Sequence, residues 1–164
     1  MRALTLLVVL SLIPALASPA VAQPGDSLSG TWRLDLQRSD PRRGPNAPPL
    51  VDTRLEVSLV GEDVRVVRNF GASPEGRVID VTYQTDGKPH EVTGPMGNPV
   101  VVRARWAKDK LRVSYTLQRG SFDLDINEIW SLDKDGELTV QYSTRMGDRM
   151  DNRKELYVRA PASD

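Results

Sequence analysis

Hydrophobic and polar residues alternate along most of the chain from residue 30 onward. The clearest case is the stretch 51–59, in which Leu55 and Val57 fall on one side and Arg54 and Glu56 on the other. A period of two residues is typical of a β-strand with one buried face and one face in water. Alternation together with the turn signals predicts nine or ten short strands, at residues 32–36, 51–59, 64–70, 78–83, 88–93, 100–106, 111–117, 122–126, 138–142 and 153–159.

Turn-forming residues separate these stretches at the spacing of β-hairpins. Asp86-Gly87 is a strong signal for a two-residue hairpin turn, and Gly61, Gly120 and Gly136 stand in other short breaks. Short strands joined in this way indicate a meander that closes into a barrel or folds into a sandwich. Hairpin connections favour an up-and-down order, and closure removes exposed edge strands. We therefore predict an all-β fold, an antiparallel up-and-down meander closed into a small barrel of about 8–10 strands.

The charged residues indicate which face of this barrel lies outside. An outer-membrane barrel would be apolar on its lipid-facing side and polar in its lumen. Here the polar positions include Glu56, Arg103, Arg105, Asp123 and Asp125, which is more charge than the interior of so small a barrel could hold. We therefore expect an apolar interior, a charged surface in water, and no membrane span in the mature chain.

The first 22 residues have the features of a signal peptide. Arg2 supplies a positive charge, residues 3–16 are almost entirely apolar, and residues 20–22 (Ala-Val-Ala) form a small-x-small cleavage site. A transmembrane helix is disfavoured because two prolines interrupt the run and no basic cluster follows it. We predict cleavage near Ala22, a single β-barrel domain over residues 23–164, and a secreted or periplasmic location.

Composition excludes several classes of function. Without Arg2 the mature chain carries 21 basic and 22 acidic residues, a balance that gives no electrostatic footprint for nucleic acid. The chain has no cysteine, which rules out disulfides, cysteine-ligated zinc and thiol catalysis. We expect neither a cofactor nor a metal.

Three motifs carry a resemblance to known proteins. Gly30-Thr31-Trp32 has the Gly-x-Trp form that opens the barrel of the calycin superfamily, the lipocalins and fatty-acid-binding proteins. The hairpins Tyr83–Lys88 and Trp106–Leu111 resemble those of exported lipocalin-like proteins of bacteria of unknown function. The resemblance implies a lipocalin-like barrel in which Gly30 and Trp32 are structural residues.

The resemblance also implies that a basic residue near the chain end packs over Trp32, and Arg153 and Arg159 are both candidates. The chain departs from both families. No helix follows the last predicted strand, and residues 40–50 are proline-rich where fatty-acid-binding proteins have a helical lid. The Arg-x-Tyr motif with which those proteins hold a carboxylate on the final strand is also absent here. The resemblance therefore does not imply that this chain binds fatty acids.

Six residues are candidates for ligand binding because they fall on the inward side of predicted strands: Tyr83, Trp106, Tyr115, Glu128, Trp130 and Tyr142. A pocket with aromatic walls and a few polar groups suits a small molecule. Two alternatives remain open. The aromatic side chains could simply fill the core, and a β-bulge near Glu128 could turn that side chain outward.

Catalytic residues are scarce. His90 is the only histidine, and nothing near it in the sequence orients its ring for proton transfer. No nucleophile elbow, zinc motif or phosphate-binding glycine loop is present. The acidic hairpin at residues 133–137 lacks the further ligands of a calcium loop. The sequence assigns no catalytic residue and favours a protein that is not an enzyme without deciding the question.

The function that the sequence favours is binding of a small, largely apolar ligand in the interior or at the mouth of an exported lipocalin-like barrel. One alternative is a structural or protein-interaction module of the cell envelope with no ligand, contacting a partner through the proline-rich loops at 41–49 and 94–99. Another is a small barrel enzyme that uses His90 or Glu128.

Overall fold

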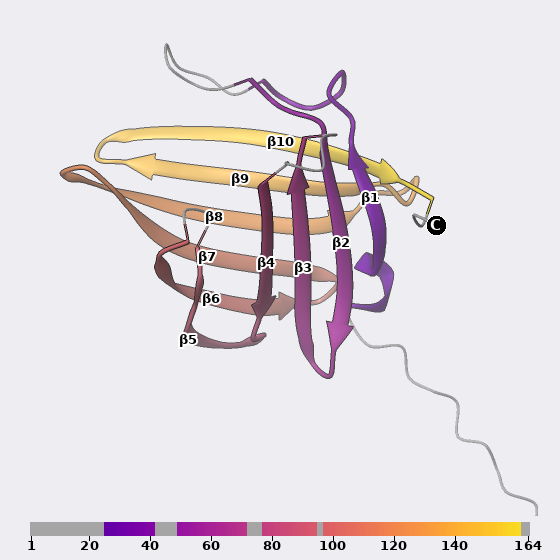
Figure 1. Ribbon diagram of the computed structural model, residues 1–164, viewed down its shortest axis with the longest axis horizontal. Coiled ribbons are helices and arrows are strands. Elements are labelled where there is room, and N and C mark those ends of the chain that lie inside the picture. The colour runs from indigo at the N-terminus through magenta and orange to yellow at the C-terminus, as the bar shows by residue number, and fades with distance from the viewer. Residues whose placement is uncertain (1–24, 42–48, 72–76, 95–96, 162–164) are drawn as a thin grey trace, which may run out of the picture.

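The computed structural model describes residues 25–41, 49–71, 77–94 and 97–161, and within these ranges the chain is almost entirely β-sheet (Figure 1). Ten antiparallel strands form one sheet in the order β4-β3-β2-β1-β10-β9-β8-β7-β6-β5. A short 3-10 turn, η1 (Asp26–Leu28), precedes them. The strands are β1 Gly30–Leu34, β2 Thr53–Val60, β3 Asp63–Phe70, β4 Arg77–Tyr83, β5 Asp86–Thr93, β6 Pro99–Ala107, β7 Lys110–Arg119, β8 Phe122–Leu132, β9 Leu138–Met146 and β10 Arg149–Arg159.

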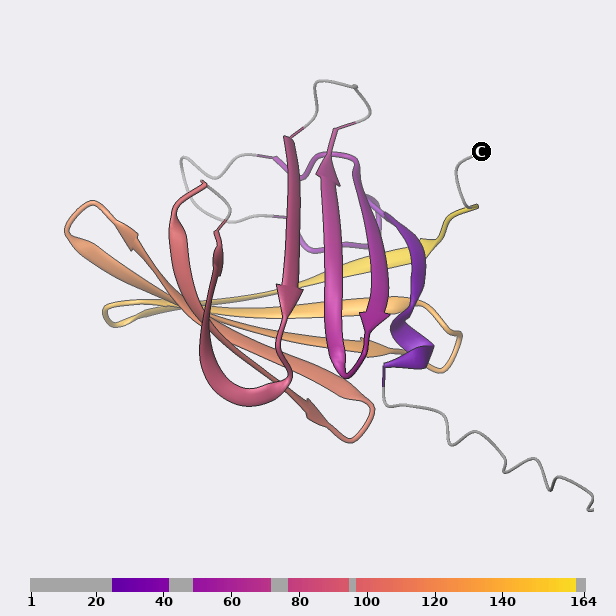
Figure 2. The same ribbon diagram turned by 60° about the horizontal axis from the view of Figure 1, so that its bottom comes forward.

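The predicted up-and-down meander is confirmed, and it forms a nearly closed barrel. Pairing of β1 with β10 joins the first strand to the last. Strands β2–β4 cross steeply over β6–β10, so that the barrel is flattened into two layers (Figures 1 and 2). β4 and β5 are the two edges of the sheet, and no hydrogen-bonded ladder joins them in the described ranges. We call the boundary between these two strands the β4–β5 seam.

Alternate residues of the strands point into one core. In β2, Thr53, Leu55 and Val57 are buried while Glu56 and Ser58 are exposed, in the phase that the alternation predicts. Each fully buried valine or leucine contributes about 1.5–3 kcal/mol. The buried core continues around the barrel through Leu28, Trp32, Leu34, Val64, Val66, Val100, Val102, Ala104, Leu111, Val113, Trp130, Leu138, Val140, Tyr142 and Tyr157.

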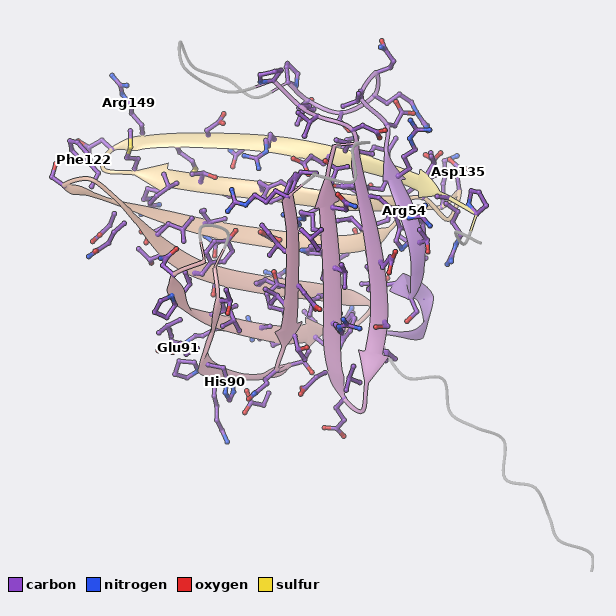
Figure 3. The ribbon with its side chains drawn as sticks, viewed as in Figure 1. Arg54, His90, Glu91, Phe122, Asp135 and Arg149 are labelled. Atoms are coloured by element: carbon purple, nitrogen blue, oxygen red, sulfur yellow. The ribbon has the colours of Figure 1, made fainter. Side chains whose placement is uncertain are left out.

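Strand β8 extends without a bulge through Glu128. Its register with β7 and with β9 is one-to-one on both sides of this residue. The two-residue period therefore continues, and the Glu128 side chain lies inside the barrel with 1% of the residue exposed. Phe122 shares the same inward phase but is exposed, because the β7–β8 hairpin extends past the body of the barrel (Figure 3).

Trp32 is buried beneath an arginine near the end of the described chain. Its indole N–H donates to the Leu28 carbonyl over 3.0 Å. The Arg159 guanidinium lies 4.3 Å from the ring centroid and donates to the Ser29 carbonyl over 3.1 Å. Of the two arginines that the sequence offers, Arg159 therefore covers Trp32, while Arg153 lies 4.0 Å over the ring of Tyr142.

Gly30 makes this arrangement possible. Its φ of 138° lies in a region that side chains disfavour. A Cβ atom built at this position would collide with the Arg159 guanidinium. The Gly-x-Trp motif thus serves two needs, because the glycine leaves room for the cation and the tryptophan supplies the ring beneath it.

The predicted leader, residues 1–22, lies outside the described residues, as do residues 42–48 and 95–96 of the two proline-rich loops. Within the part that the structure describes, no helix has the length and apolar character needed to cross a membrane.

Candidate ligand-binding site

A narrow cavity lies inside the barrel between strands β3 and β8. Its empty space is about 470 Å³ including the mouth. The volume within which the centre of a water molecule can lie is about 40 Å³. By this measure each water needs about 10–15 Å³, so the cavity has room for about three waters. The walls combine apolar and polar side chains of six strands: Val66, Arg68, Ile79, Val81, Tyr83, Val92, Thr93, Gly94, Val100, Val102, Tyr115 and Glu128.

The cavity reaches the outside through the β4–β5 seam. Ile79 of β4 and Thr93 of β5, together with Gly94, line both the cavity and an open cleft between the two edge strands. Because no ladder joins β4 to β5 in the described chain, parting them breaks no strand-to-strand hydrogen bonds. Opening the barrel at the seam therefore leaves every ladder of the sheet intact.

Glu128 is the buried acceptor of the cavity. One carboxylate oxygen accepts the Tyr115 hydroxyl over 2.8 Å. The other accepts the indole N–H of Trp130, also over 2.8 Å. Indole nitrogen can only donate, so the Glu128 oxygen that faces Trp130 is an acceptor. Each Glu128 oxygen therefore already has one donor.

Arg68 faces Glu128 from strand β3 and is not fully hydrogen-bonded. Its Nη2 lies 3.9 Å from a Glu128 oxygen, beyond hydrogen-bond distance. The guanidinium also lies 5.6 Å from the Trp130 ring centroid. Its Nε and Nη2 atoms are buried and find no acceptor among the described residues. Burial alone would lower the Arg68 pKa, but nearby acidic groups, Glu128 among them, outweigh it and raise that pKa. The arginine is charged and has donors to offer.

A second polar cluster lies on β10. The Arg153 Nε is 3.5 Å from a Glu155 oxygen, and the Tyr157 hydroxyl donates to the other oxygen over 2.7 Å. Glu155 and Tyr157 are buried. None of the three lines the cavity described above. Within this cluster the positive charge of Arg153 is balanced by the negative charge of Glu155.

Burial raises the pKa of all four tyrosines of the chain, Tyr83, Tyr115, Tyr142 and Tyr157, above the ordinary value of 10.0. The Glu128 carboxylate adds to the shift at Tyr83 and Tyr115, because its negative charge opposes a phenolate. At Tyr157 the nearby Glu155 acts in the same way. These hydroxyls therefore stay protonated near neutral pH.

An alkaline titration should reveal these shifts. The folded chain holds its phenol protons above about pH 10, while the unfolded chain loses them. The contribution to stability is therefore fully present below about pH 10 and is lost as the pH rises further. We expect phenolate absorbance to appear together with the loss of near-ultraviolet circular dichroism. Reversible ionisation of several tyrosines near pH 10 in a protein that stays folded would contradict this expectation.

The structure brings only some of the six candidate residues together. Tyr83, Tyr115 and Glu128 line the cavity, and Trp130 contacts it through its hydrogen bond to Glu128. Trp106 instead packs near Gly25 and Leu59, beside η1. Tyr142 is opposite Glu128 in the β8–β9 register and lies beneath Arg153, but it is not part of the cavity wall.

Arg68 is the site residue that sequence reasoning missed. A signal was available, because Arg68 follows Val64 and Val66 at intervals of two and therefore shares their inward phase. A charged residue at an inward-facing position of a strand is also what made Glu128 a candidate.

The structure places His90 away from the cavity, and a nearby carboxylate orients its ring, contrary to the expectation from the sequence. Its Nε2 lies 2.8 Å from an Asp86 oxygen, and the side chain sits at the lower end of β5 (Figure 3). It is not among the residues that line the cavity. Across the described ranges, no three histidine or acidic side chains are grouped so that they could hold a metal ion.

Comparison with known proteins identifies the fold. No model of a known protein family matches the chain, and no curated protein sequence matches it. Solved structures do match. Lipid binding protein 8 of Caenorhabditis elegans is 13% identical with a TM-score of 0.59, over 89% of this chain and 100% of that one.

Two further structures have the same architecture. The fatty acid binding protein of Schistosoma mansoni, solved in complex with arachidonic acid, is 14% identical with a TM-score of 0.55, over 82% of this chain and 97% of that one. The wild-type fluorescent protein UnaG is 18% identical with a TM-score of 0.57, over 83% and 99%. At these identities the likeness concerns the fold, and the chain has a β-barrel like that of fatty-acid-binding proteins.

Proposed function

We propose that this barrel binds a small, largely apolar molecule in the cavity, which the ligand enters through the β4–β5 seam. The observation that carries the proposal is the cavity itself, in which six aliphatic side chains surround the unmatched donors of Arg68. Apolar walls with a few oriented polar groups are the usual composition of a small-molecule site.

The structural neighbours support the proposal. They include a lipid binding protein and a fatty acid binding protein that holds arachidonic acid. In this structure the cavity has room for only about three waters, so even a slender ligand would enter only as the β4–β5 seam parts and the walls move. The apolar leader at residues 1–22 supports a site of action outside the cytoplasm, and we propose that the protein is an exported, lipocalin-like carrier.

Titration with a panel of fatty acids, isoprenoids and aromatic compounds tests this function. Trp130 is the natural reporter, because it contacts Glu128 in the cavity wall. We expect a ligand-dependent change in tryptophan fluorescence that disappears in Trp130→Phe and persists in Trp106→Phe, whose ring lies beside η1. A panel in which no compound binds would reject the proposal and favour the protein-interaction alternative.

A matched pair of variants on β4 tests the location. Val81 is buried and lines the cavity, whereas Val78 on the same strand is exposed and lines only the outer cleft. Val81→Phe fills the cavity and should weaken binding at least about tenfold, which is about 1.4 kcal/mol. Val78→Phe adds the same ring outside the cavity and should leave the affinity unchanged. Equal effects of the two variants would place the ligand elsewhere.

A further inference from the structure

Two opposite charges face each other across the cavity. Arg68 and Glu128 are the charged residues among its described lining, and they come from β3 and β8. Their nearest atoms are 3.9 Å apart. The Arg153–Glu155 pair on β10 is balanced separately. The wall of the cavity therefore carries no net charge before a ligand enters.

The hydrogen bonds of this pair are unequal. Both Glu128 oxygens have a donor, the Tyr115 hydroxyl on one and the Trp130 indole on the other. The Arg68 Nε and Nη2 atoms are buried and have no acceptor among the described residues. A buried donor without a partner is costly, so an acceptor that reached these two nitrogens would be favoured. Both are closed to water in this structure, so an acceptor reaches them only when the cavity walls move.

The charge of Glu128 decides which kind of acceptor fits. A carboxylate on the ligand would reach Arg68 only by placing a second negative charge close to Glu128, in surroundings of low dielectric where like charges repel strongly. A hydroxyl or carbonyl oxygen accepts the same hydrogen bonds and adds no charge. The raised pKa values of Tyr83 and Tyr115 keep both side chains neutral, so they do not alter this balance.

We propose that the ligand is an uncharged apolar molecule with an alcohol, ketone or ester oxygen that accepts a hydrogen bond from Arg68, and that Glu128 excludes carboxylic acids. This inference rests on the proposed function, because it names the class of molecule that the same cavity takes. It separates this barrel from one that selects its ligand by a free carboxylate.

A series of three compounds with one alkyl chain tests the selectivity: dodecanol, methyl dodecanoate and dodecanoate. Each is titrated at neutral pH, where the acid is ionised, and followed by displacement of a fluorescent apolar probe. For the unmodified protein we expect the alcohol and the ester to bind at least about tenfold more tightly than the acid, a difference of about 1.4 kcal/mol.

Glu128→Gln removes the negative charge with little change in size. With Arg68 then unbalanced, the acid should gain at least about tenfold relative to the alcohol, and the preference should reverse. Glu155→Gln is the matched control, because Glu155 is also buried and hydrogen-bonded to a tyrosine but does not line the cavity. It should leave the preference of the unmodified protein intact.

The outcomes separate this inference from the proposed function. Tighter binding of dodecanoate to the unmodified protein would overturn the inference and leave ligand binding standing. No binding by any of the three, or by the wider panel, would overturn both. If Glu128→Gln does not fold, Arg68→Met provides the second arm, since removal of the donors should abolish the advantage of the alcohol over an alkane of equal length. Retention of that advantage would count against Arg68.

Discussion

Replacing Trp32 by alanine is expected to lower the free energy of unfolding by about 3–5 kcal/mol. Trp32 is fully buried, and its removal leaves a large cavity beside Leu28 and Leu55. It also deprives the Leu28 carbonyl of its donor and Arg159 of the ring beneath it. Urea unfolding followed by far-ultraviolet circular dichroism measures the change, with an unchanged slope as evidence that the folded state is preserved.

Two control variants resolve the causes of this loss. Trp32→Phe keeps an aromatic ring under Arg159 but removes the indole donor, and it should cost less than Trp32→Ala. Trp106→Ala removes a tryptophan that is only partly buried at the edge of the core, so it should also cost less. If Trp106→Ala proved as damaging as Trp32→Ala, the special role of the first strand would be refuted.

Replacing Glu128 by leucine is expected to cost about 3–5 kcal/mol, because it leaves the half-buried Arg68 charge without its counter-ion. It also leaves the Tyr115 hydroxyl and the Trp130 indole without their acceptor. The size of the side chain is nearly preserved, so lost packing contributes little. Urea unfolding at neutral pH gives the magnitude.

A double-mutant cycle with Arg68→Met separates the two causes. The double variant removes both charges, and it should be more stable than the sum of the single changes predicts, by about 0.5–3 kcal/mol. Two donors still lack an acceptor in the double variant, so its stability should not return fully to that of the unmodified protein. Strict additivity of the two changes would show that Arg68 and Glu128 do not interact.

The strands and most turns could be predicted from the sequence because they depend on local patterns. Alternation and turn signals together located all ten strands. The hairpin turn predicted at Asp86-Gly87 was wrong, because both residues belong to β5 and no ladder joins β5 to β4 in the described chain. The least accurate bounds were at strand ends. β1 stops at Leu34, and Leu36 is exposed, because the chain turns at Asp35, whose carboxylate accepts the backbone N–H groups of Gln37 and Arg38.

The site was predictable only in part. Alternation through Ile126 and Trp130 placed Glu128 in the inward phase, and only the register of β8 with both neighbours showed that no bulge intervenes. Arg68 has the same signal in its own strand, but its significance depends on Glu128, which lies far along the chain. The pattern also could not separate Tyr83 and Tyr115, which line the cavity, from Trp106, which packs near η1.

The sequence by itself therefore determined an all-β meander with an apolar inner face, because side-chain alternation and turn chemistry act between near neighbours in the chain. The tertiary structure alone decided that β1 pairs with β10, that Arg159 and not Arg153 covers Trp32, that Arg68 meets Glu128, and that the sheet stays unpaired between β4 and β5. Each of these depends on how the strands curve and which distant residues they bring within a few ångströms. Such distances are set by the closure of the whole barrel rather than by any stretch of it.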